Sequence, residues 1–160
     1  MKKIISYSFI LVLLLINIAT IQVTEECDAT ALKNVLKDKL KPEYKYDSSK
    51  TTRFYYKTKP QQKEIEVPLY LGEKYRFLFN TEGLKGDVKI EIYSKPFGHK
   101  KRKLLYSLEQ KEGQNIYTFE PQKSRKMYIN YTIPKVEETT TVRECIILVV
   151  GYKLKTLADI

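Results

Sequence analysis

Hydrophobic and polar residues alternate with a period of two along most of the chain after residue 52. Successive side chains of a β-strand point to opposite faces, so this alternation predicts strands that each bury one face. Gly and Pro residues that favour turns separate the alternating runs. The runs cover 54–56, 65–71, 75–79, 88–92, 104–108, 117–119, 127–133 and 142–150.

This pattern predicts a mainly β fold, an antiparallel β-sandwich with seven to eight short strands. A closed barrel is the alternative. The run 142–150 is apolar on both faces from Cys145 onward, which indicates a central strand that is covered on each side. Pro68 cannot donate a ladder hydrogen bond, so its strand should lie at an edge or contain a bulge.

A helical period occurs once, ahead of the strands. Apolar residues recur at helical spacing from Ala29 to Leu40, Asp28 can cap the first turn, and Pro42 ends the pattern. We expect this short helix to pack against an open end or edge of the sandwich. The polar segment 43–52 is expected to be a connector.

The first residues have the pattern of a secretory signal. Lys2 and Lys3 precede an apolar run over 4–21, and Ala19 offers a small residue for cleavage. An uncleaved anchor is the alternative, because the run is just long enough to cross a bilayer. Lipid attachment at Cys27 is disfavoured by the two glutamates before it. We therefore expect export to the periplasm, the cell surface or the medium.

About 141 residues would remain after such a cleavage, enough for one domain with a real core. The expected division is 1–22 signal peptide or anchor, 23–52 helix and connector, 53–154 sandwich, and 155–160 tail.

The chain has two cysteines, Cys27 and Cys145, and one histidine, His99. An even pair in an oxidising compartment predicts a disulfide, which would tie the N-terminal segment to the last strand. Free buried thiols are the alternative. Two thiols and one histidine do not make a zinc site, and we expect no metal and no cofactor.

The formal net charge is +10. Such an excess attracts anionic partners such as phosphates, acidic glycans or lipid head groups, although solvated lysines also occur simply to keep proteins soluble. Four adjacent cations form a candidate anion-binding hairpin: Lys100, Lys101, Arg102 and Lys103. A solvated loop is the alternative for this run. No feature specifies nucleic acid, and export argues against it.

Tyr70, Tyr93 and Tyr128 fall on the polar sides of their strands. They could form an aromatic strip for sugar rings or a protein partner, since tyrosine combines apolar area with a hydroxyl. The alternative is that cross-strand tyrosines stabilise an exposed sheet face.

The sequence contains no nucleophile elbow, zinc-protease motif, phosphate-binding loop or calcium loop. His99 lies in a strongly cationic loop, which disfavours a role as a base. Glu64 and Glu66 fall on one strand face and are interpreted as a solvated surface rather than as a glycosidase pair. We expect a protein that is not an enzyme.

The strands Gly72–Phe77, Asp87–Tyr93, Met127–Tyr131 and Ile146–Tyr152 together resemble the small jelly-roll sandwiches of the pre-peptidase C-terminal and GOLD families. The similarity covers about residues 62–153. It implies a binding or accessory role rather than catalysis. GOLD cargo proteins have a C-terminal membrane span, whereas the segment 155–160 of this chain is expected to be a soluble tail.

These observations lead to one hypothesis of function: an exported, non-catalytic β-sandwich that binds a cell-envelope protein or an anionic or glycan polymer. A small hydrolase with an unrecognised site and a purely structural envelope component are the alternatives.

Overall fold

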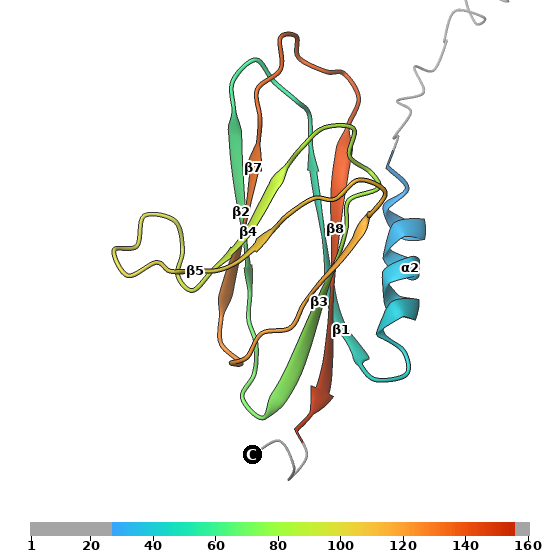
Figure 1. The fold of residues 1–160 in the computed structure, drawn as a ribbon, viewed down its shortest axis with the longest axis vertical. Coiled ribbons are helices and arrows are strands. Elements are labelled where there is room, and N and C mark those ends of the chain that lie inside the picture. The colour runs from blue at the N-terminus through green and yellow to red at the C-terminus, as the bar shows by residue number, and fades with distance from the viewer. Residues whose placement is uncertain (1–26, 156–160) are drawn as a thin grey trace, which may run out of the picture.

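The computed structural model describes residues 27–155, which form one helix and eight strands (Figure 1). The predicted signal peptide and all of the predicted tail except Lys155 lie outside the described residues. The elements are α2 (Ala29–Leu40), β1 (Lys45–Phe54), β2 (Gln61–Val67), β3 (Glu73–Asn80), β4 (Lys89–Tyr93), β5 (Leu104–Leu108), β6 (Ile116–Phe119), β7 (Met127–Ile133) and β8 (Glu144–Leu154).

The strands form two four-stranded antiparallel sheets. The order is β1-β8-β3-β6 in sheet A and β2-β7-β4-β5 in sheet B. The pairs are nested: β4 pairs with β5, β3 with β6, β2 with β7, and β1 with β8. This arrangement is the eight-stranded jelly roll. The predicted mainly β sandwich is confirmed, and the two separate sheets exclude the closed barrel.

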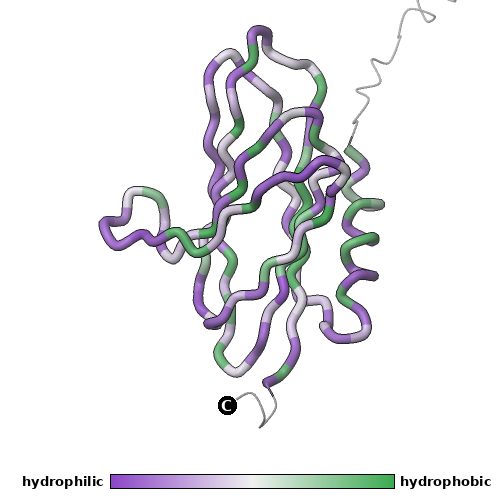
Figure 2. The backbone as a smooth tube through the Cα atoms, in the orientation of Figure 1, coloured by the Kyte–Doolittle hydropathy of each residue, from purple (hydrophilic) through white to green (hydrophobic). Residues whose placement is uncertain are grey.

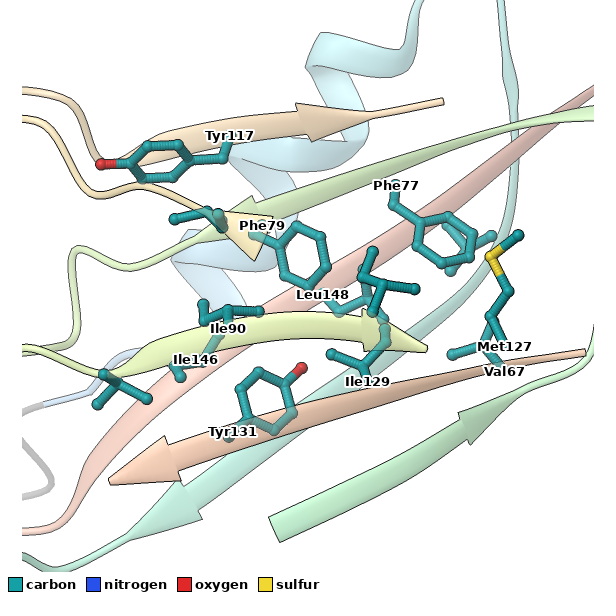
Figure 3. Close-up of a cluster of buried hydrophobic side chains, with 14 of the residues drawn as sticks. Val67, Phe77, Phe79, Ile90, Tyr117, Met127, Ile129, Tyr131, Ile146 and Leu148 are labelled. Atoms are coloured by element: carbon teal, nitrogen blue, oxygen red, sulfur yellow. The ribbon is translucent and has the colours of Figure 1, made fainter. Parts of the chain in front are cut away.

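The core lies between the two sheets, where alternate side chains of both meet (Figure 3). Phe77 and Phe79 of β3 and Leu148 of β8 pack toward Ile129 and Tyr131 of β7, and all five are fully buried. Such packing of apolar side chains removed from water is the main stabilising term for a sandwich of this size.

A second cluster lies on the outer face of sheet A, under α2. Leu36 and Leu40 are buried there against Ile147 and Val149 of β8. The prediction that the helix packs against an end or edge was therefore wrong. Because β8 is apolar on both faces, its outer face needs a cover, and α2 provides it.

One contact stabilises the start of α2, and another lets the end of the helix pack closely on the sheet. Asp28 caps α2, its carboxylate accepting hydrogen bonds of 3.0 Å from the N–H groups of Thr30 and Ala31. Gly151 of β8 lies directly under Leu40, and a Cβ at this position would come within 2.5 Å of the Leu40 Cδ2 atom. A larger residue at Gly151 would therefore force the Leu40 side chain out of its present place against β8.

The predicted disulfide is confirmed, and it joins Cys27, just before α2, to Cys145 near the start of β8. Both cysteines are buried. Gly83 packs against the bond, where a Cβ would lie 3.0 Å from the Cys27 Sγ and 2.8 Å from the Cys145 carbonyl oxygen. Disulfides persist in oxidising compartments, which favours an exported protein.

The predicted connector 43–52 is mostly strand, because β1 begins at Lys45. β1 is an edge strand whose first residues are largely exposed, so its polar side chains do not alternate with apolar ones. Its backbone nevertheless pairs with β8 along nearly its whole length. The edge position inferred from Pro68 agrees with the structure, since β2 is an edge strand that ends just before it.

We expect the disulfide to stabilise the domain strongly, because it closes a loop of 118 residues. The variant Cys27→Ser/Cys145→Ser should lose about 4–5 kcal/mol of unfolding free energy. Denaturant titration of both proteins with and without reductant measures this. Reductant should destabilise the wild type and leave the variant unchanged, and a loss below about 1 kcal/mol would contradict the expectation.

Stability should also fall at alkaline pH because of buried tyrosines. Burial raises the pKa of Tyr131 well above its usual value near 10 and, with Glu73 nearby, raises the pKa of Tyr75 to about 12. A raised folded-state pKa gives stability that is complete below the unfolded pKa and is lost as the pH rises past it. Unfolding free energy should therefore decline above about pH 10, and less steeply in Tyr131→Phe. Tyr46→Phe, at an exposed position, should follow the wild-type curve.

Candidate anion-binding site

The antiparallel order brings alternate loops to the same end of the sandwich. The loops β2–β3 (68–72) and β6–β7 (120–126) lie at one end, with the α2–β1 connection (41–44) and Lys155, and the β4–β5 loop (94–103) leaves β4 toward that end and projects to the side of the molecule (Figure 1). We call this set the basic end. Hydrogen bonds join its parts: the Ser124 hydroxyl donates to the Glu73 carbonyl at 2.5 Å, and the Lys155 N–H to the Gly72 carbonyl at 3.1 Å.

Charge is distributed unequally between the two ends. The segments of the basic end contain ten basic and two acidic residues, a net charge of +8. The described segments at the opposite end contain six basic and seven acidic residues, a net charge of −1; they are 27–28, 55–60, 81–88, 109–115 and 134–143. The excess positive charge of the described loops is therefore concentrated on one end of the molecule.

A pocket of about 360 Å³ lies at this end, between the β4–β5 hairpin and the start of β7. Five of its seven lining residues are basic. Its lining is Ser94, Lys95, Lys101, Lys103, Arg125, Lys126 and Tyr128. Lys101 and Lys103 of the predicted cationic run, together with Tyr128 of the predicted tyrosine strip, thus line one pocket.

One of the five cations is already paired. The Lys126 ammonium lies 2.7 Å from the Glu66 carboxylate, and this contact raises the pKa of Lys126. Among residues 27–155, Lys95, Lys101, Lys103 and Arg125 form no ion pair with a carboxylate. Like charges held this close repel each other, so an anion in the pocket would be stabilised by all four.

Local hydrogen bonds shape the hairpin that carries Lys101 and Lys103. At its base the Ser94 N–H donates to the Lys103 carbonyl at 2.9 Å, and the Lys103 N–H donates to the Ser94 hydroxyl at 3.0 Å. At its tip Gly98 has a φ of +80°, and the His99 Nδ1 accepts from the Lys101 N–H at 3.0 Å. His99 therefore helps to form the turn.

Arg102 has a different role from its neighbours. Its guanidinium lies 2.6 Å from the Glu64 carboxylate on β2 and 3.7 Å from the centre of the Tyr93 ring. Glu64 also accepts a 3.0 Å hydrogen bond from the Phe97 N–H. The side chain of Arg102 is only 13% exposed. Arg102 thus holds the hairpin, which projects from the side of the molecule opposite α2 (Figure 1), against sheet B.

The three predicted tyrosines do not form one strip. Tyr93 and Tyr128 are direct cross-strand neighbours on β4 and β7, but Arg102 covers the ring of Tyr93. Tyr70 lies apart from them, in the β2–β3 loop, and is 67% exposed. Tyr128 is the one of the three that lines the cationic pocket. Lys100 is exposed at the hairpin tip and does not line it.

Sequence reasoning missed the contribution of Arg125 and Lys126. They are far from the cationic run in the chain, and the loop topology alone brings them close to it. The jelly-roll order would have indicated this, because it places loops 94–103 and 120–126 at the same end. Arg125 also borders a second pocket of about 350 Å³, whose lining includes Leu105, Phe119 and Met127.

The two glutamates that could have formed a catalytic pair, Glu64 and Glu66, are each paired with a cation. Within residues 27–155, no group of three His, Cys, Asp or Glu side chains is placed to hold a metal ion. In the same residues, no helix has the length and apolar character to span a bilayer.

A comparison with protein-family models and with curated proteins finds no match to this chain. The resemblance to the pre-peptidase C-terminal and GOLD families stays a prediction. The function is therefore inferred from the geometry and charge of the site.

The Arg102–Glu64 pair should be necessary for the hairpin to stay in place. We expect Glu64→Gln to lower the unfolding free energy by about 1–2 kcal/mol, because it leaves a largely buried guanidinium without its anion. It should also speed tryptic cleavage after Lys100 and Lys101. Glu66→Gln is the matched control on the same strand, since Glu66 pairs with an exposed lysine and such pairs contribute little. Equal effects of both variants would contradict this role.

Proposed function

We propose that this protein is an exported, non-catalytic binding module that attaches to an anionic component of the cell envelope through its basic end. The observation that carries the proposal is the convergence of Lys95, Lys101, Lys103 and Arg125 on one pocket without a carboxylate partner among the described residues. Cations placed together at the cost of mutual repulsion favour an anionic ligand.

The charge distribution supports binding at a distance as well as at contact. A net charge of +8 on the segments of one end, against −1 on those of the other, orients the molecule in the field of an anionic surface. At contact, phosphate, sulfate or carboxylate oxygens would accept charge-assisted hydrogen bonds from the lysines and Arg125. Ser94 and Tyr128 complete the lining of the pocket beside the cations.

The rigidity of the hairpin supports the same function. The Glu64–Arg102 pair and the Ser94–Lys103 hydrogen bonds place Lys101 and Lys103 before a ligand arrives. A preorganised site loses less conformational entropy on binding. The pairing of Glu64 and Glu66 with cations also favours binding over hydrolysis, since a glycosidase would need two carboxylates free to act on substrate.

Removal of the pocket cations should abolish most of the binding to polyanions. We expect Lys101→Ala/Lys103→Ala/Arg125→Ala, purified as the exported protein, to bind immobilised heparin and polyphosphate at least about tenfold more weakly than the wild type. A salt series measures the electrostatic share, which should shrink in the variant.

The matched control removes three cations from the other end, as Lys57→Ala/Lys59→Ala/Lys135→Ala. It has the same net charge as the pocket variant and should keep most of the affinity. If both variants lose affinity equally, the net charge alone attracts polyanions and the pocket is not a site.

A further inference from the structure

Three apolar side chains at the basic end are exposed to solvent, and we call them the apolar tip: Tyr70, Leu71 and Leu154. Leu71 is 89% exposed, Leu154 70% and Tyr70 67%. Tyr70 and Leu71 lie in the β2–β3 turn, and Leu154 ends β8 beside it, opposite Glu73 in the ladder. This turn and the end of β8 are at the foot of the molecule, where Figure 2 shows apolar residues among polar ones.

The conformation of the turn is held by specific contacts. The buried Tyr75 hydroxyl accepts a 3.1 Å hydrogen bond from the Tyr70 N–H and donates to the Glu73 carboxylate. Gly72 provides the left-handed backbone of the turn, with a φ of +89°. Exposure of Tyr70 and Leu71 is therefore a feature of a fixed turn, and ordering it on binding would cost little entropy.

Exposed apolar residues and positive charge occur at the same end. Seven large hydrophobic side chains are exposed among residues 27–155, and five of them lie within the basic end or directly beside it: Tyr70, Leu71, Phe97, Leu104 and Leu154. Lys155 follows Leu154 in the chain, and loop 120–126 with its three cations is tied to the turn through Ser124.

We infer that the basic end docks onto the surface of an anionic lipid bilayer, with the apolar tip inserted among the head groups. The inference rests on the proposed function and names the anion as lipid phosphate. A hydrated polymer would satisfy the lysines but offers no apolar medium for Leu71. The interface of an anionic membrane offers both negative charge and hydrocarbon, and peripheral proteins bind it with this combination.

A second copy of the chain fits the apolar tip less well. Two such ends facing each other would bring two net charges of +8 together, and their repulsion would oppose the small apolar contact. The exposed area of three side chains is also well below that of a stable protein interface.

The test compares vesicles of phosphatidylcholine with vesicles that also contain phosphatidylglycerol, using the exported protein and co-sedimentation. We expect binding to the anionic vesicles and little to the neutral ones. Tyr70→Ser/Leu71→Ser should reduce vesicle binding about tenfold, because it removes apolar area from the interface. The same variant should bind heparin and polyphosphate as well as the wild type does. Val35→Ser, at an exposed position on α2, is the matched control and should change neither vesicle binding nor polyanion binding.

Insertion itself can be measured because the chain contains no tryptophan. Leu71→Trp should show a blue-shifted emission with anionic vesicles and quenching by brominated lipid, whereas Val35→Trp should show neither. Unchanged Leu71→Trp emission, or full vesicle binding by Tyr70→Ser/Leu71→Ser, would overturn the inference and leave polyanion binding in place. Self-association that depends on Leu71 would overturn it in favour of a second copy. Binding to neither vesicles nor polyanions would overturn the proposed function as well.

Discussion

The burial of β8 on both faces is the constraint on which the other layers of this structure depend. From Cys145 to Val150 each residue of the strand is fully buried, so neither face can be left to water. Sheet B covers the inner face and α2 covers the outer one. The disulfide holds the start of the helix at this strand, and Gly151 lets Leu40 approach it. The molecule therefore has three layers rather than the two of a simple sandwich.

The position of the candidate site follows from strand direction. In a jelly roll with antiparallel strands, the even-numbered strands all end at the same end of the sandwich, where Lys155 follows β8. Three loops that are separated in the chain by pairs of strands thus share one surface, and each contributes cations or apolar residues to it. Most of the cationic side chains of the pocket lie in these loops rather than in the sheets. The sheets position the loops.

Much of the fold could be predicted from the sequence, because strands and helices with one buried face repeat apolar residues at a characteristic spacing. The alternation in β3, β4 and β7 and the apolar run of β8 indicate their roles correctly, and Asp28 and Pro42 bound the helix well. β1 was not predicted, because an exposed edge strand is held by backbone hydrogen bonds and leaves no alternation of apolar and polar side chains in the sequence. The position of α2 could not be predicted without knowing the sheet order, which leaves the outer face of β8 for the helix to cover.

The candidate site could be predicted only in part. The cationic run Lys100 to Lys103 can be recognised in the sequence. The different roles of its four residues cannot. Arg102 faces Glu64 because the hairpin folds against sheet B, and Arg125 joins the pocket because two distant loops share an end. Both facts depend on long-range geometry. Tyr70 was assigned to a strand face, whereas it lies in a loop beyond the end of β2.

The nested pairing of the strands has a consequence for the order of folding. β1 has one partner strand, and that partner is β8, the last of the strands in residues 27–155. Sheet A therefore cannot form in full before β8 has been made, and the pairing of residues ninety or more positions apart makes folding slow. Because β1 and β3 both take β8 as their neighbour, sheet A is held together by a strand that is synthesised after the other seven described strands, so its two halves can join only when β8 is present.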